Sequence, residues 1–272
     1  MIVFAARCLR AALVLVPLAT VASAQESTKE PPRIEDNSFL VEEAYNQETG
    51  VVQHISNFRR APDGAWLFTF TQEWPAPSQR HQFSYTAPLV SNRPGGTGVG
   101  DLALNYRYQA LGREGSSVWL APRLSVVLPT GDAATGRGLG GPGLQTMIPL
   151  SVELTNTFVT HWNAGYTATR ARDTDGMRRT LGVLNAAASA IWLVAPTLNV
   201  MLESTWDRTE SFDAGSTTRS DDHFTIMPGV RGAINLRSGM QIVPGIGLPF
   251  VRSAGSTERD LFLYFSVEHS FR

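Results

Sequence analysis

The chain has 272 residues, of which 43% are hydrophobic and 17% charged, and its formal net charge at pH 7 is −1. This near-neutral balance argues against nucleic acid as a partner. The five histidines are scattered singly, without metal-ligand spacing, and the only cysteine is Cys8. The sequence therefore predicts no metal site, no disulfide and no bound cofactor.

The N-terminus has the features of an export signal. Arg7 and Arg10 precede a short apolar run at 11–20, and an Ala-Ser-Ala triplet at 22–24 supplies the small residues that a signal peptidase requires. The apolar run is shorter than the ~20 residues that a spanning helix needs, so a membrane anchor is the weaker explanation. We expect residues 1–24 to be a cleaved signal peptide.

Residues 25–50 show no clear period and are predicted to be a periplasmic N-terminal segment. Alternation stays poor across residues 39–60. Two alternatives therefore remain open for that stretch: a first strand, or a segment folded into the lumen of the barrel that the rest of the chain predicts.

Period-two alternation dominates the remainder, residues 51–272. In residues 144–154, for example, leucine, isoleucine, valine and threonine alternate with small and polar residues. Because successive side chains of a strand point to opposite faces, each such segment has one apolar and one mixed polar face. The pattern predicts about twelve strands, near 51–59, 65–74, 80–88, 98–110, 117–129, 143–154, 157–169, 181–193, 196–208, 223–234, 239–251 and 260–271.

Strand length and loop length favour a membrane barrel over a soluble sandwich. Most predicted strands are long enough for the ~9–11 residues of a tilted strand that crosses a bilayer. The longer polar connections, 130–142, 170–180, 209–222 and 252–259, each follow an odd-numbered strand. In bacterial outer-membrane barrels the long loops face outward and both chain ends face the periplasm. We therefore predict an all-β, transmembrane, antiparallel up-and-down barrel in the bacterial outer membrane.

Prolines within the predicted strands are the main conflict. Pro122, Pro149, Pro228 and Pro244 each remove a hydrogen bond from the strand ladder. Lipid offers no substitute donor for the carbonyl that loses its partner. The sequence provides no account of Pro122.

Particular stretches resemble a family of outer-membrane transporter proteins that is commonly labelled as belonging to the meta-pathway of phenol degradation. The resemblance spans nearly the whole mature chain. It rests on Ser38 to Glu48 running into Val51 to Ile55, on Gly98-Val99-Gly100-Asp101-Leu102, and on Leu128-Pro129-Thr130-Gly131-Asp132. It implies a barrel with an uptake role, and it supplies no binding residues to carry over.

Eight charged or titratable residues fall on the predicted inward faces: Asp101, Arg107, Arg123, Glu153, His161, Glu203, Arg231 and Glu268. They are the candidate substrate-path residues, because a charged constriction screens solutes by size and sign. The alternative is a set of ion pairs that fills and braces a barrel too narrow to conduct. A barrel of this size lies between the filled eight-stranded type and the open 16–18-stranded porins.

The predicted function is a channel for passive uptake of small, partly apolar or aromatic molecules. Its expected partners are outer-membrane lipid, the solute and the barrel-assembly machinery, and it is expected to be monomeric. Competing hypotheses are a non-conducting structural or adhesion barrel and, less favoured, a lipid hydrolase. We predict no enzyme, because Ser151 and Thr205 are inward hydroxyls without an evident base in the sequence and no G-x-S-x-G run occurs.

Overall fold

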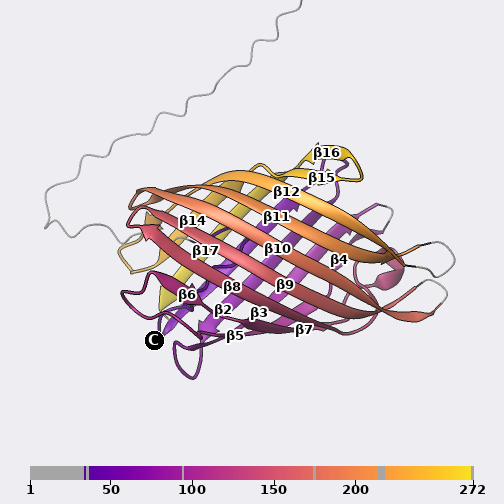
Figure 1. Cartoon of the computed structure of the whole chain (residues 1–272), viewed down its shortest axis with the longest axis horizontal. Helices are drawn as coiled ribbons and strands as arrows, with labels where there is room; N and C mark the ends of the chain where they lie inside the picture. The colour runs from indigo at the N-terminus through magenta and orange to yellow at the C-terminus, as the bar shows by residue number, and fades with distance from the viewer. Residues whose placement is uncertain (1–33, 35–36, 94, 174–175, 214–217, 271–272) are drawn as a thin grey trace, which may run out of the picture. The chain divides into compact units, whose positions relative to one another are not determined.

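The computed structural model describes residues 34, 37–93, 95–173, 176–213 and 218–270, which belong to one compact unit of the chain. The strands of this unit close into an antiparallel barrel of twelve spans (Figure 1). A span is one crossing of the barrel wall, made of one strand or of two strands that continue each other across a break. The predicted fold class is thus confirmed. The predicted signal peptide lies outside the described residues.

Seven spans are single strands: β1 (Val51–Arg60), β2 (Trp66–Pro75), β3 (His81–Asn92), β8 (Gly143–Thr155), β9 (Phe158–Arg172), β10 (Arg178–Ala195) and β11 (Leu198–Phe212). Five are divided: β4 (Gly96–Val99) with β5 (Leu102–Tyr108), β6 (Val118–Leu120) with β7 (Arg123–Leu128), β12 (Thr218–Gly232) with β13 (Ile234–Asn235), β14 (Gln241–Gly247) with β15 (Phe250–Ser253), and β16 (Ser256–Arg259) with β17 (Leu261–Ser270).

The barrel closes where β1 pairs antiparallel with β17, from Val51 opposite Ser270 to Arg60 opposite Leu261. We call the end at which β1 begins and β17 ends the termini end, and the opposite end the distal end. No helix among the described residues is long and apolar enough to cross a membrane. The expectation that the termini end faces the periplasm stays a prediction.

The outer and inner faces of the wall differ in chemistry. Outward-facing Leu144, Ile148 and Trp162 on β8 and β9 are about half exposed, at 50, 52 and 52%. Inward-facing Ser151 and Glu203 are fully buried. An apolar outer surface around a polar interior is the reverse of a soluble protein and is typical of a barrel surrounded by lipid.

Four of the five breaks in the divided spans contain a proline or are bonded to a proline carbonyl. The break between β6 and β7 contains Pro122, whose carbonyl accepts a hydrogen bond from the Tyr108 N–H at 3.0 Å. The break between β14 and β15 faces Pro228, whose carbonyl accepts from the Leu248 N–H at 3.1 Å. The carbonyls of these two prolines therefore remain bonded inside the wall. Four predicted continuous strands, 98–110, 117–129, 223–234 and 239–251, are thus corrected to divided ones, and Pro122 lies in a break rather than inside a continuous strand.

Three predicted long loops are wrong, because their polar residues continue the strand ladder. Arg172 pairs with Arg178, Phe212 with Thr218, and Ser253 with Ser256. The connections shrink to 173–177, 213–217 and 254–255, whereas 129–142 stays long and holds a short 3-10 helix, Ala133–Thr135. Backbone pairing does not require apolar side chains. The polar composition of these segments therefore led to strands that were predicted too short. Loop length consequently distinguishes the two barrel ends less clearly than the sequence indicated.

Candidate functional site

The lumen segment, residues 37–50, crosses the barrel interior without regular secondary structure before β1 begins. Its backbone N–H groups donate to side-chain oxygens of the wall at 2.6–3.2 Å: Phe39 and Leu40 to Glu203, Glu42 to Asn163, Ala44 to Ser151, Asn46 to Gln109, and Gln47 to Gln82. Side chains of the wall therefore replace the backbone partners that a strand would have. All these wall residues lie in the half of the barrel nearest the termini end.

Glu203 on β11 is the strongest of these anchors. Its two carboxylate oxygens accept the N–H groups of Phe39 at 2.6 Å and of Leu40 at 2.7 Å. Nearby, the Ser38 hydroxyl donates to Ser189 on β10 at 2.8 Å. Glu203 thus holds two consecutive N–H groups of the lumen segment. Glu203 therefore fixes the position at which the lumen segment leaves the β10–β11 wall.

Arg107 on β5 and Arg123 on β7 stand directly opposite each other in the sheet and both point inward. Like charges in this position repel, and a buried cation needs a counter-charge. Arg123 makes a two-point contact with Glu42, at 2.9 and 2.5 Å. Arg107 lies 3.7 Å from the Glu43 carboxylate and donates to the carbonyls of Glu43 and Tyr45. Two consecutive acids of the lumen segment thus compensate two opposed arginines of the wall.

Ser151 and His161 form a second, neutral anchor. The Ser151 hydroxyl lies 2.7 Å from His161 Nδ1 and accepts the Ala44 N–H at 2.7 Å, and both side chains are fully buried. The ring of Tyr45 meets the imidazole edge-on, at 5.9 Å between centroids. The expectation that Ser151 has no base nearby was therefore wrong. The lumen segment nonetheless covers the Ser151 hydroxyl, so the Ser151–His161 pair has a structural role.

Phe39 fills the other side of the lumen. Its ring lies 5.4 Å from that of Phe262 and 5.2 Å from that of Tyr264. A Cβ at Gly229 or Gly245 would lie 2.6 Å from the Phe39 ring, so only glycine permits this approach. The surrounding cluster of buried apolar side chains also contains Ile34, Ile191, Met201, Met227 and Val243.

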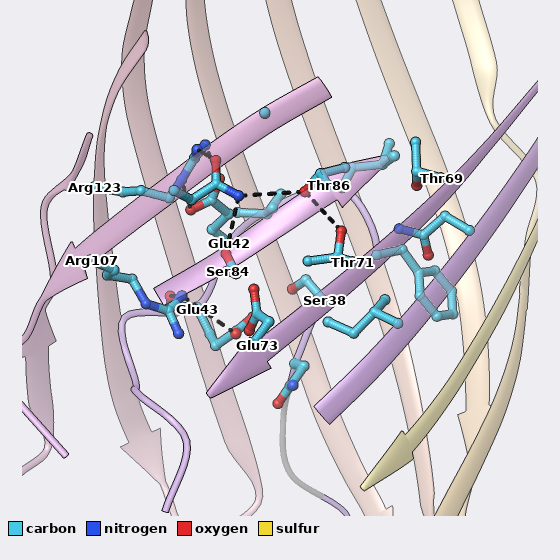
Figure 2. A pocket seen from close by; sticks show the side chains of 18 of the residues that line it. Ser38, Glu42, Glu43, Thr69, Thr71, Glu73, Ser84, Thr86, Arg107 and Arg123 are labelled. Atoms are coloured by element: carbon cyan, nitrogen blue, oxygen red, sulfur yellow. Dashed lines mark hydrogen bonds and ion pairs between the residues drawn. The ribbon is translucent and has the colours of Figure 1, made fainter. Parts of the chain in front are cut away.

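A cavity of about 330 Å³ remains between the lumen segment and the wall (Figure 2). It is bounded by residues 37–43 on one side and by inward residues of β1, β2, β3, β5, β7, β8 and β17 on the other. Its wall is mainly hydroxyl and amide, and the Thr71 and Thr86 hydroxyls are 2.9 Å apart. Glu73 faces the cavity, and its carboxylate accepts from the Gln82 amide at 2.8 Å.

The structure distributes the eight predicted substrate-path residues over four environments. Arg107, Arg123, His161 and Glu203 contact or anchor the lumen segment, and the two arginines also line the cavity. Arg231 is buried in the wall and Glu268 is half-buried opposite Gln53. Glu153 is exposed near the termini end. The Asp101 carboxylate accepts the N–H groups of Gly131 and Leu139, so it holds the 129–142 connection.

The candidate list did not include three acids of the cavity. Glu73 occupies an inward position of β2, and period-two counting within the predicted strand 65–74 would have found it. Glu42 and Glu43 lie in a stretch without alternation, so no periodic signal could place them. Their position follows only from contacts with Arg123 and Arg107.

No model of a known protein family matches this sequence, and no curated protein matches it. Solved structures do share the fold. An outer-membrane channel from Pseudomonas putida F1 superposes with a TM-score of 0.61 at 12% identity, covering 84% of this chain and 98% of that one.

Two porins are similar at lower scores. The NanC porin gives a TM-score of 0.49 at 9% identity, covering 81% of this chain and 99% of its own. The KdgM porin, in complex with disordered oligogalacturonate, gives 0.46 at 8% identity, covering 82% and 99%. At such identities the likeness extends to the fold and no further. The chain has the fold of a bacterial outer-membrane β-barrel.

Proposed function

We propose that this protein is an outer-membrane channel through which small solutes diffuse passively, with the lumen segment as its constriction. The observation that carries the proposal is the polar cavity of about 330 Å³ between that segment and the wall. If the lumen segment only filled and braced the barrel, we would not expect a charged, hydroxyl-lined space to remain beside it. The outer-membrane channel of Pseudomonas putida F1 has the same barrel fold.

The setting of the channel is part of the same proposal. Residues 1–24 direct export and are removed, and the barrel enters the outer membrane through the barrel-assembly machinery, with both chain ends in the periplasm. The apolar outer face supports contact with lipid on all sides and hence a monomer.

The cavity chemistry favours small polar solutes that are neutral or positively charged. Glu42 and Glu43 offset Arg123 and Arg107, whereas Glu73 adds a carboxylate that is bonded to a neutral amide. The cavity lining therefore carries one more acid than base. Aromatic or apolar solutes, and the phenol pathway that the family resemblance implies, have weaker support, because Phe39 and Tyr264 are the aromatic rings among the lining residues.

A non-conducting barrel is the second candidate function, and one observation favours it. The lumen segment is bonded to the wall from Ser38 to Gln47, and its contacts bury the side chains that a wide pore would expose. A barrel closed in this way would serve envelope integrity or adhesion.

Single-channel recording in planar bilayers separates the two functions. We expect the refolded mature protein to give small, discrete conductance steps with a preference for K⁺ over Cl⁻. Glu73→Gln keeps the side-chain size and should lower that preference, because it removes the extra negative charge of the cavity. Glu114→Gln changes an exposed side chain of the 109–117 connection at the termini end; it is the matched control and should leave the preference unchanged.

Aromatic acids and small ammonium compounds, added in turn, identify the solute class by block of the current. Block by ammonium compounds alone agrees with the proposed class, and block by aromatic acids alone contradicts it. Silence from a heat-modifiable, folded barrel would overturn the channel proposal in favour of the non-conducting barrel.

A further inference from the structure

Three arginines lie together on the outward face at the distal end of the β9–β10 hairpin. Arg172 on β9 stands directly opposite Arg178 on β10, and Arg170 stands opposite Thr180. All three belong to the outward row of their strands, which continues from Trp162 and Tyr166 on β9. All three are exposed.

Their spacing concentrates positive charge. Directly opposite residues have Cβ atoms about 5 Å apart, and diagonal neighbours about 7–8 Å. The three guanidinium groups can therefore converge on one anion. Without an anion, the Arg172–Arg178 pair is a repulsive cross-strand contact at a position where the sheet gains from opposite charges.

No acid of the described residues neutralises this trio. Among those residues, Arg170, Arg172 and Arg178 have no side-chain hydrogen bond or ion pair. Acids on the hairpin and on the neighbouring strands have other partners: Asp173, which follows Arg172, accepts the Met177 N–H at 2.7 Å. Glu210 on β11 accepts the Gly182 N–H at 2.7 Å, and Asp222 on β12 binds Arg208 at 2.8 Å.

The backbone beneath the trio is held from both sides. On one side of β9, β10 pairs with it as far as Arg172. On the other side of β9, the Arg170 N–H donates to the Pro142 carbonyl and the Arg172 N–H donates to the Leu139 carbonyl, each at 2.9 Å. The Leu139 side chain is 42% exposed beside this contact. A rigid basic surface with an exposed apolar side chain at its edge matches a lipid that has an anionic headgroup.

The depth of the trio agrees with a headgroup. Tyr166 belongs to the outward aromatic residues that mark the membrane interface in such barrels. Arg170 follows it by four residues, about 13 Å further along the strand at ~3.3 Å per residue. The trio therefore lies beyond the hydrocarbon region, where phosphate groups of lipids are found.

We propose that Arg170, Arg172 and Arg178 form a binding site for the phosphate groups of a lipid headgroup. Arginine recognises phosphate through two parallel N–H···O bonds, so three guanidinium groups suit a headgroup with more than one phosphate. The identity of the ligand rests on the proposed function, which places both chain ends in the periplasm. In that orientation the distal end of the barrel faces outward. The ligand is then the phosphorylated lipid A portion of lipopolysaccharide.

The test uses the refolded mature barrel and purified diphosphorylated lipid A. Arg170→Gln/Arg172→Gln/Arg178→Gln removes the trio. Arg80→Gln/Arg113→Gln/Arg237→Gln removes the same charge from three exposed arginines in connections at the termini end. Retention of lipid A by each protein is measured by native mass spectrometry and by titration in detergent.

We expect the trio variant to bind lipid A at least about tenfold more weakly, since each arginine near an anionic lipid surface contributes about 1 kcal/mol. The control variant should bind as the wild type does. Dephosphorylated lipid A and phosphatidylglycerol should bind weakly to all three proteins. Equal binding by both variants, or a preference for phosphatidylglycerol, would overturn the proposal.

Measuring conductance on the same variants separates a failure of the lipid site from a failure of the proposed channel. The trio lies on the outer surface, so its loss should leave the channel steps unchanged. A silent barrel that still loses lipid A binding with the trio would overturn the channel and keep the lipid site. A conducting barrel whose two variants bind lipid A equally would overturn the lipid site and keep the channel.

Discussion

Among the residues that the structure describes, two pairs of arginines stand directly opposite each other, one pair on each face of the same sheet. Arg107 and Arg123 face the lumen, where Glu42 and Glu43 of the lumen segment compensate them. Arg172 and Arg178 face outward, and no acid among the described residues compensates them. The inward pair is buried or nearly so, whereas the outward pair is exposed.

The difference shows how the surroundings decide the role of the same local arrangement. An uncompensated pair inside the barrel would cost several kcal/mol, so the chain supplies its own acids there. At the surface, water screens the repulsion and the pair can remain without a protein partner until an external anion binds. The inward pair therefore has a structural role, and the outward pair is suited to a ligand.

The largest effect should follow from removing the acids of the inward pair. Glu42→Gln/Glu43→Gln leaves two opposed arginines in the wall. We expect a loss of about 2–3 kcal/mol in the free energy of unfolding, at the low end for a buried pair because the Glu42 side chain is 31% exposed. Urea unfolding in lipid vesicles, followed by tryptophan fluorescence, measures it.

The matched control for this prediction is Glu114→Gln, which should change the unfolding free energy by less than about 0.5 kcal/mol. A quadruple variant in which Arg107 and Arg123 also become glutamine should recover part of the loss, because it removes the repulsion itself. Equal stability of the double variant and the wild type would mean that the lumen segment does not compensate the arginines.

The neutral anchor provides an intermediate effect. Ser151→Ala leaves His161 Nδ1 and the Ala44 N–H without their shared hydroxyl and should cost about 2 kcal/mol. Unfolding measured as above tests the size of the effect. Fatty acid released from added phospholipid should be undetectable in both proteins. Release by the wild type that disappears in Ser151→Ala and in His161→Gln would instead make this pair part of an enzyme.

The smallest effect on stability, with the opposite sign, is expected at the outward pair. Arg172→Glu places an acid opposite Arg178 and should stabilise the barrel by about 0.5 kcal/mol, as a cross-strand ion pair does. The same change should abolish lipid A binding. Arg172→Gln serves as the control, since it removes the repulsion without adding an attraction. Reduced stability of Arg172→Glu would show that the two arginines do not repel each other in the folded barrel.

Alternation alone placed most of the wall correctly. Period two in residues 144–154 and 198–208 decides which side chains face lipid, because backbone geometry sends neighbours to opposite faces whatever their partners are. The number of spans follows from the same signal. The inward position of Arg107 and Arg123 could be predicted for the same reason.

Contacts between segments far apart in the chain could not be predicted. The extended hairpin around residues 173–177 pairs polar residues whose composition resembles a loop. The Ser151–His161 contact joins adjacent strands whose register the sequence did not state, since period two gives a face but no partner.

The sequence by itself therefore determined the class of fold and the two chemistries of the wall, because both follow from local geometry and hydrophobicity. The tertiary structure decided what occupies the lumen and which charges are compensated. Glu42 and Glu43 meet their arginines across 81 and 64 positions of chain. Electrostatic compensation depends on distance in space, and only the closed barrel brings those residues together.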